Sequence, residues 1–174
     1  MSRILAACLA MLLSACSYLP PKGIEPVSPF DLQRYLGQWY EIARLDHSFE
    51  RGLSDIGATY SLNEDGSVRV LNRGYDIERG KWKDAVGRAV FTGDTNTAAL
   101  KVSFFGPFYG GYNVIALDPD YRWSMVMGPD RSYLWILSRD KRLPDNIRDM
   151  LLQKARAAGV DTDKLIWVSH TRER

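Results

Sequence analysis

The chain has 174 residues, of which 45% are hydrophobic and 25% charged, and its formal net charge is +2. A chain of this length normally forms one domain, and a nearly neutral charge balance argues against a nucleic-acid-binding protein or a polybasic membrane-surface protein. The two cysteines, Cys8 and Cys16, both lie near the N-terminus. We therefore expect no disulfide in the main body of the chain, which must be stabilised by its core alone.

Residues 1–15 have the features of a secretory signal. Arg3 precedes an apolar run over residues 4–13 that is too short to span a bilayer, and small residues follow it. The Leu-Ser-Ala-Cys sequence that ends at Cys16 resembles the lipobox of bacterial lipoproteins. This resemblance implies cleavage after residue 15 and multiple acylation of Cys16, and two or more acyl chains give stable anchoring. An ordinary signal peptide would not explain the position of this cysteine.

The residues after Cys16 predict where the protein resides. Ser17 stands where, by analogy with lipoproteins, an aspartate would cause retention in the inner membrane. The resemblance therefore implies a lipid-anchored protein of the bacterial outer membrane that faces the periplasm. Residues 17–29 contain four prolines and no periodicity, which predicts an extended tether. The expected organisation is a signal peptide over 1–15, a lipidated cysteine with a proline-rich tether over 16–29, and one domain over 30–174.

Short strands are predicted from Trp39 onward, after one turn of helix over residues 30–35. Clusters of Gly, Pro, Asn and Asp separate the runs of alternating or apolar residues. These clusters predict tight turns. Their even spacing favours an antiparallel up-and-down meander, because parallel strands would need long crossovers. After the first strand, which begins near Trp39, strands are expected over 56–62, 68–73, 82–91, 98–105, 112–117, 123–127 and 133–138.

The periodicity changes after the eighth predicted strand. Pro144 and the two residues after it form a helix-start signature, and apolar residues then recur at helical spacing until Gly159. We expect this helix to pack its apolar stripe on the outside of the sheet. Residues 165–168 are predicted to form a short ninth strand.

Three motifs, in this order, resemble the conserved regions of the lipocalins. They are Gly37-Gln38-Trp39, the Asp-Pro-Asp-Tyr sequence over 118–121, and Ser138-Arg139. Residues 40–52 and 133–140 resemble the bacterial outer-membrane lipocalins and the apolipoprotein D branch, and the similarity extends over nearly all of 30–170. The resemblance implies an all-β fold, an eight-stranded antiparallel up-and-down β-barrel or calyx with one C-terminal α-helix beside it. The middle motif departs from the usual Thr-Asp-Tyr, which leaves the local turn open.

The resemblance also implies a structural role for three residues. In the family, the arginine after the eighth strand lies across the tryptophan of the first. Arg139 is therefore expected to cover Trp39 and to close the barrel floor, and a guanidinium over an indole contributes about 0.5–2 kcal/mol. Gly37, Trp39 and Arg139 are assigned to closure of the fold and not to ligand chemistry.

An eight-stranded barrel encloses either packed side chains or one small ligand. Strand alternation, with Trp39 pointing inward, and the family resemblance together place many small residues, a few aromatic rings and scattered polar groups on the inner face. A filled core would use bulkier aliphatic residues and fewer polar atoms, so we predict an apolar ligand cavity. The register over 112–117 and 123–127 stays open, because both faces are apolar. The residues predicted to bind the ligand are Glu41, Ala43, Ile56, Ala58, Tyr60, Val70, Asn72, Gly87, Ala89, Val102, Phe104, Tyr133 and Trp135.

Such a cavity suits an acyl chain with a polar end near the mouth. Burial of about ten methylenes contributes roughly 8 kcal/mol before ordering costs are subtracted, which predicts micromolar binding with weak discrimination between chain lengths. The inner face and the resemblance together predict a membrane-anchored protein that stores or transports fatty acids or lysophospholipids for outer-membrane maintenance.

A second hypothesis is an anchored protein-interaction module with a filled barrel. Its docking surface would be an aromatic rim, and the same rim could form a homodimer or contact the membrane. The residues expected in this rim are Phe104, Phe105, Phe108, Tyr109 and Tyr112.

The sequence does not predict an enzyme. It contains no His-Cys-carboxylate set with metal-ligand spacing, no Gly-x-Ser-x-Gly elbow and no phosphate loop, so no metal or cofactor is expected. His47, near the predicted mouth, is expected to be a surface residue. Glu41 would be of interest if it is buried, and a hydrogen-bonded structural role is expected for it.

Overall fold

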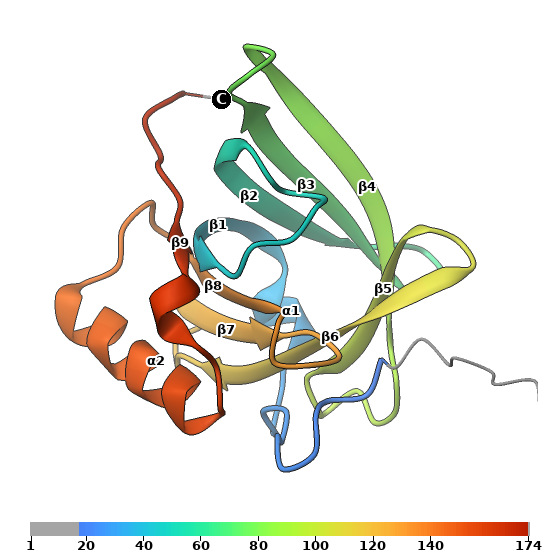
Figure 1. The fold of residues 1–174 in the computed structure, drawn as a ribbon. Helices are drawn as coiled ribbons and strands as arrows, with labels where there is room; N and C mark the ends of the chain where they lie inside the picture. The colour runs from blue at the N-terminus through green and yellow to red at the C-terminus, as the bar shows by residue number, and fades with distance from the viewer. Residues whose placement is uncertain (1–17, 174) are drawn as a thin grey trace, which may run out of the picture.

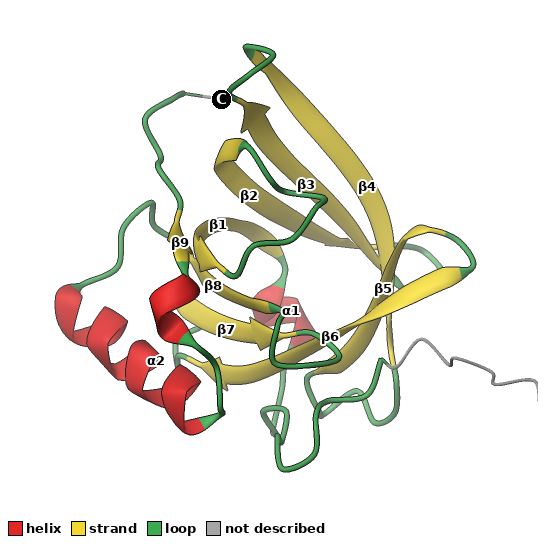
Figure 2. Cartoon of the chain, viewed as in Figure 1, coloured by secondary structure: helices red, strands yellow, loops and turns green. Residues whose placement is uncertain are grey.

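Eight antiparallel strands close into a barrel in the computed structural model, which describes residues 18–173 (Figures 1 and 2). The predicted signal peptide, Cys16 and Ser17 lie outside the described residues. Each strand pairs with its neighbours in sequence, and β1 pairs with both β2 and β8, which closes the sheet. The strands are β1 (Gly37–Arg44), β2 (Leu53–Leu62), β3 (Val68–Asp76), β4 (Lys81–Phe91), β5 (Ala99–Phe105), β6 (Phe108–Leu117), β7 (Trp123–Met127) and β8 (Leu134–Ser138).

The remaining elements flank the barrel. The helices are α1 (Leu32–Tyr35) and α2 (Asp145–Ala157), followed by a 3-10 turn η1 (Thr162–Lys164) and the short strand β9 (Ile166–Trp167), which pairs with β1. The predicted all-β architecture, with its C-terminal helix and ninth strand, is confirmed. None of the helices within residues 18–173 is long and apolar enough to cross a membrane.

The helix α2 packs on the outside of the barrel beside β7 and β8 (Figure 1). Leu151 and Ala155 are four residues apart, so they lie on one face of the helix, and both are fully buried. They join a cluster that includes Met125 and Ile136 from the outer face of the barrel wall. A second apolar cluster, which includes Trp39, fills the lower part of the barrel interior. The barrel closes within residues 18–173, and the members of both clusters that the structure describes lie there.

A β-bulge in β1 changes which residues point into the barrel. Glu41 lies opposite Leu137, but the register shifts by one residue before Ala43, which lies opposite Ile136. A shift of one residue exchanges the two faces of a strand. Ala43 therefore packs in the outer cluster under α2, and the prediction that it faces the cavity is wrong. The next residue, Arg44, is buried at 2% exposure and contacts Glu41.

The segment over residues 18–29 does not extend away from the domain as the predicted tether would. The amide of Val27 donates to the carbonyl of Val114 at 2.8 Å, and its carbonyl accepts from the amide of Ala98 at 2.9 Å. Arg131 donates to the carbonyl of Lys22 at 3.0 Å. These bonds attach the segment to the barrel wall, because the backbone there still has free donors and acceptors that a neighbouring chain can satisfy.

The C-terminal residues are attached to β2 through one buried carboxylate. Asp55 has a φ of 52° and accepts from the amides of Thr171 and Arg172, both at 2.7 Å, and from the Arg172 guanidinium at 3.0 Å. Burial alone would raise the pKa of Asp55, but the hydrogen bonds from Ser54, Arg172 and Thr171 outweigh it and lower the pKa from 3.8 to about 2. Asp55 is therefore ionised at neutral pH and holds the C-terminal residues against β2.

Candidate functional site

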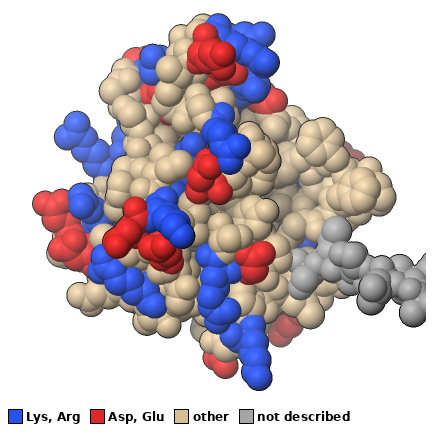
Figure 3. All heavy atoms as spheres, in the orientation of Figure 1, with Lys and Arg blue, Asp and Glu red and all other residues tan. Residues whose placement is uncertain are grey.

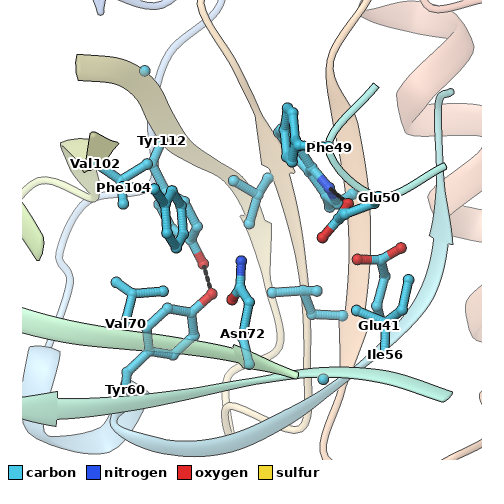
Figure 4. A pocket seen from close by; sticks show the side chains of 16 residues that line it. Glu41, Phe49, Glu50, Ile56, Tyr60, Val70, Asn72, Val102, Phe104 and Tyr112 are labelled. Atoms are coloured by element: carbon cyan, nitrogen blue, oxygen red, sulfur yellow. Dashed lines mark hydrogen bonds between the residues drawn. The ribbon is translucent and has the colours of Figure 1, made fainter. Parts of the chain in front are cut away.

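A cavity lies inside the barrel and reaches the surface beside Phe49, which lines it and is 59% exposed (Figure 4). The cavity volume, counted as the space open to the centre of a water-sized sphere, is about 90 Å³. The predicted residues that line it are Glu41, Ile56, Ala58, Tyr60, Val70, Asn72, Val102, Phe104 and Trp135. The lining residues absent from the predicted site are Phe49, Glu50, Gly57, Gly111, Tyr112, Val126 and Leu137.

Three other predicted residues lie close to this cavity without lining it. Gly87 lies under the ring of Phe104, and a Cβ on Gly87 would be 2.8 Å from that ring, so only glycine leaves room for the phenylalanine. Tyr133 precedes β8 and is half-buried beside Trp135, with 6.2 Å between the ring centroids. Ala89 lies deeper in the barrel and lines a second, smaller cavity.

Two tyrosines separate the two cavities. Tyr60 and Tyr112 line both, and their hydroxyl oxygens are 2.8 Å apart (Figure 4). The hydroxyl of Tyr112 is also 2.8 Å from that of Tyr35, which in turn is 3.0 Å from the hydroxyl of Ser124. The lower cavity has room for a sphere centre in only about 20 Å³, and its walls include Phe30, Val68 and Leu100. We call Tyr60 and Tyr112 the tyrosine pair.

The phenols of this region are neutral. Burial raises the pKa of Tyr35 to about 12 and raises the pKa values of Tyr60 and Tyr112 well above their ordinary value. Each hydroxyl therefore keeps its proton and can donate to a neighbour in the chain from Tyr60 to Ser124. The apolar barrel interior thus contains one fully hydrogen-bonded polar partition, which satisfies groups that would otherwise be costly to bury.

The barrel floor lies below the lower cavity. The guanidinium carbon of Arg139 is 3.9 Å from the centroid of the Trp39 ring, and the indole nitrogen donates to the carbonyl of Tyr35 at 2.8 Å. Gly37 has a φ of +92°, and a Cβ there would be 3.4 Å from an Arg139 nitrogen. The three residues assigned to closure of the fold thus lie together at the floor, away from the lining of the upper cavity.

An ionisable cluster lies in the wall of the upper cavity. Glu41 and Arg44 form an ion pair at 3.1 Å, with side chains only 4% and 3% exposed. A carboxylate oxygen of Glu50 is 2.7 Å from Nε2 of His47 and accepts from the Trp135 indole at 3.1 Å. Arg44 also donates to the backbone carbonyl of Glu50 at 3.0 Å. Since His47 is only 6% exposed, the prediction of a surface histidine is wrong.

The two carboxyl groups of this cluster face each other across the cavity wall (Figure 4). Burial raises the pKa of Glu41 well above its ordinary value, the nearby carboxylate of Glu50 raises it further, and Arg44 opposes both effects. Two adjacent carboxylates cannot both ionise cheaply at a buried site, so Glu41 retains its proton more strongly than an exposed glutamate does.

Aromatic rings surround the entrance to the cavity. The ring of His47 stacks on Phe49 with 3.7 Å between centroids and lies 5.3 Å from Trp135 and 6.2 Å from Tyr133. Phe49 is the exposed member of this group, so a ligand that enters here passes its ring. Within residues 18–173 no group of three or more His, Cys, Asp or Glu side chains is placed to hold a metal ion.

The molecular surface carries no continuous patch of one charge on the face shown in Figure 3. Acidic and basic side chains alternate over α2 and over the β3–β4 hairpin.

The candidate site inside the barrel combines an apolar interior, a neutral tyrosine partition and a buried acidic cluster near its entrance. This arrangement can hold a molecule with one apolar chain and one polar end.

Comparisons with known proteins agree with this geometry. A family model described as a lipocalin-like domain matches residues 30–170. The outer membrane lipoprotein Blc of Citrobacter freundii is 57% identical over 166 residues, which cover 95% of this chain and 94% of the relative. Apolipoprotein D of Cavia porcellus is 34% identical over 144 residues, which cover 78% of this chain and 75% of the relative. Among solved structures, insecticyanin from Manduca sexta has a TM-score of 0.70 at 23% identity, covers 88% of this chain and 87% of its own, and shares the fold.

Proposed function

This chain belongs to the lipocalin family, and on that premise we propose that it is a membrane-anchored protein that stores or transports fatty acids or lysophospholipids in its barrel. The observation that carries the proposal is the upper cavity, whose walls are apolar except for one acidic cluster, Asn72 and the tyrosine pair. The acyl chain would lie against Val70, Val102 and Phe104, with its polar end toward Glu41 and Glu50.

The proposed location follows from the relatives and from the N-terminal sequence. Relatives that are 57% and 56% identical are named outer membrane lipoproteins. We infer that Cys16 is the acylated residue and that the barrel stands on the periplasmic face of the outer membrane. Its role there would be to carry lipids for maintenance of that membrane, by binding and release without catalysis.

The volume of the cavity sets a condition on binding. About 90 Å³ is below the roughly 300–1,000 Å³ typical of small-molecule sites. A full acyl chain therefore requires side chains to move, and Phe49 at the entrance and the tyrosine pair at the base are placed to do so. Opening the tyrosine pair would join the lower cavity, with its wall of Phe30, Val68 and Leu100, to the upper one.

The proposal is tested by titrating the chain from residue 17 onward with fatty acids and lysophospholipids and following tryptophan fluorescence. Trp135 lines the cavity and reports its occupation. We expect saturable micromolar quenching that is lost in an Ala58→Phe variant, because the new ring fills the upper cavity. The matched control is Ala157→Phe, on an exposed position of α2. No saturable change with any acyl ligand in the unaltered protein would refute the proposal.

A second candidate function is an anchored interaction module. The observation that favours it is an exposed aromatic hairpin, in which Phe105 and Phe108 are 81% and 67% exposed. Phe104 and Tyr112, expected in the same rim, line the cavity instead, and a cavity argues against a filled barrel. The test is a Phe105→Ser, Phe108→Ser double variant in sedimentation velocity. Loss of a dimer with unchanged lipid binding would assign these rings to self-association.

A further inference from the structure

The polar part of the cavity wall is acidic. Glu41 and Glu50 both line it, and their side chains are 4% and 8% exposed. No lysine or arginine is among the lining residues that the structure describes. The nearest guanidinium, that of Arg44, is held by Glu41 through one nitrogen and by the backbone carbonyl of Glu50 through another. A ligand that reaches this cluster therefore meets carboxyl groups first, while the Arg44 guanidinium is bonded through two of its nitrogens and leaves its buried Nε without a partner.

The same wall supplies several hydrogen-bond acceptors. Ionised carboxylates only accept hydrogen bonds, and the indole donor of Trp135 is already used by Glu50. The amide of Asn72 also lies in the cavity, between the carboxyl pair and the tyrosine pair (Figure 4), and within residues 18–173 it has no hydrogen-bond partner. Its carbonyl oxygen supplies a third acceptor. A group with several donors and a positive charge matches this set.

The rings at the entrance fit the same kind of group. Phe49 and Trp135 line the cavity next to Glu50, with 6.4 Å between their ring centroids. Aromatic faces attract ammonium groups, and the attraction grows when the group is removed from water. A carboxylate in the same position would lie against the faces of the rings and beside Glu50, where both contacts are repulsive.

We propose that the polar end of the ligand carries a primary ammonium group, and that Glu41, Glu50 and Asn72 accept its hydrogen bonds. The ligand class is a single-chain lipid with an aminoalkyl headgroup, and the inference rests on the proposed lipid-binding function. The acyl chain then points down the barrel toward the tyrosine pair. Free fatty acids and lipids with uncharged glycerol headgroups bind more weakly, because they leave the carboxyl pair without a cation.

The charged groups around Glu41 are compatible with the binding of an ammonium group. The groups that act on the carboxyl group of Glu41 are Arg44 on its own strand and Glu50 from the β1–β2 loop, which also pairs with His47, and Tyr60 of β2 lies near enough to be affected by it. His170 contacts the backbone carbonyl of Glu41 at 2.7 Å. Burial and Glu50 raise the pKa of Glu41, so its carboxyl binds a proton more tightly than an exposed glutamate does, and an ammonium group beside it would lower that pKa again.

The test compares lysolipids that share one acyl chain and differ in headgroup. The chain from residue 17 onward is titrated calorimetrically at pH 7 with lysophosphatidylethanolamine, lysophosphatidylcholine, lysophosphatidylglycerol and the free fatty acid. We expect the ethanolamine lipid to bind at least about tenfold more tightly than each of the others, since one charge-assisted contact is of this size. The trimethylated headgroup of the choline lipid keeps the positive charge but has no N–H donors. The difference in affinity between the choline and ethanolamine lipids therefore measures the contribution of the hydrogen bonds apart from that of the charge.

Variants then locate the preference. In a Glu41→Gln, Glu50→Gln protein we expect the ethanolamine preference to fall below about threefold, because the charged acceptors are gone. The matched control is Asp46→Asn, which removes a negative charge from the same loop at an exposed side chain paired with Arg51 outside the cavity. It should leave the preference unchanged. If the double variant does not fold, the comparison of headgroups on the unaltered protein decides the question by itself.

The outcomes are distinguishable. Equal affinity for all headgroups, tighter binding of the fatty acid, or choline binding as tight as ethanolamine binding overturns the ammonium site and leaves the lipid-carrier function in place. Absence of saturable binding with every lipid overturns the carrier function and the inference together. An ethanolamine preference that survives in the Glu41→Gln, Glu50→Gln protein shows that the headgroup is recognised elsewhere, and overturns the inference.

Discussion

Arg139 lies across the indole of Trp39, with 3.9 Å between the guanidinium carbon and the ring centroid. The same guanidinium donates to the carbonyls of Arg34, Leu36, Gln38 and Tyr121 at 2.8–3.1 Å. One side chain therefore joins the segment that enters β1, the β6–β7 turn and the end of β8. A planar guanidinium with five donors can make these bonds together, and an ammonium group cannot.

We therefore predict that Arg139→Lys lowers the free energy of unfolding by about 1–3 kcal/mol, because several carbonyls lose their donors while the positive charge remains. Urea denaturation followed by tryptophan fluorescence measures this loss. The matched control is Arg148→Lys, which alters an exposed arginine 4.6 Å from the ring of Trp167. Equal effects of the two substitutions would show that the floor bonds contribute nothing beyond the contact with the ring.

The tyrosine pair is predicted to limit the length of the bound chain. Tyr112→Ala removes the ring that separates the two cavities, so a longer acyl chain can reach the apolar walls of the lower one. Each added methylene that becomes buried contributes about 0.8 kcal/mol. We measure binding with a series of lysolipids whose acyl chains have about 10 to 18 carbons. We expect the chain length that binds most tightly to shift toward longer chains. Tyr109→Ala, at a half-buried position of the β5–β6 hairpin, should leave the optimum where it is.

Glu41 is predicted to make the protein less stable as the pH rises. Its pKa is raised in the folded state, by burial first and by Glu50 second, above the ordinary value of 4.5. The folded protein thus binds a proton more tightly than the unfolded chain, so the contribution is complete below that ordinary value and is lost as the pH rises through the folded pKa. Thermal unfolding of the wild type and of Glu41→Gln measures it by difference. We expect the unfolding free energy of the variant to rise relative to that of the wild type as the pH increases above 4.5. A constant difference across this range would contradict the raised pKa.

Asp55 is predicted to behave in the opposite way. Its pKa is lowered from 3.8 to about 2, so its contribution is present above the ordinary value and is lost as the pH falls through the folded pKa. Asp55→Asn should cost about 2 kcal/mol of unfolding free energy at neutral pH, and the cost should disappear near the acid end of the titration. Asp84→Asn is the control, because that carboxylate is 48% exposed and lies 3.5 Å from Arg73. A cost for Asp55→Asn that is independent of pH would assign the effect to geometry and not to charge.

Strand alternation predicted much of the cavity correctly. In β2 and β3 the inward residues Ile56, Ala58, Tyr60, Val70 and Asn72 follow a strict period of two, and all line the upper cavity. Alternation failed for Ala43, where the period is broken, and the predicted Gly87, Ala89 and Tyr133 lie close to the upper cavity without lining it. The bulge after Glu41 moved Ala43 to the outer face, and nothing in the local sequence marks an inserted residue.

The lining residues that strand alternation did not predict lie in segments without a clear alternating pattern. Glu50 and Phe49 belong to the β1–β2 loop, and a loop that folds back over the barrel leaves no periodic signal. Tyr112 lies in β6, where both faces are apolar and another shift in register follows between Val114 and Ala116. The sequence shows Glu50 and Phe49 close to His47. Their contacts with Trp135 become apparent only in the fold.

The attachment of residues 18–29 to the barrel has a consequence for how the protein would sit at a membrane. Tyr18 lies beside Lys101, whose ammonium is 4.6 Å from its ring, and its carbonyl lies against Gly111. Cys16 is two positions before Tyr18 in the sequence, and an extended chain covers at most about 3.6 Å per residue. An acylated Cys16 would hold this point of β5 and β6 within about 7 Å of the lipid headgroups, whereas a free thirteen-residue coil would range over about 20 Å. The anchor would then act as a pivot, and lipid exchange would depend on the tilt of the barrel about that pivot.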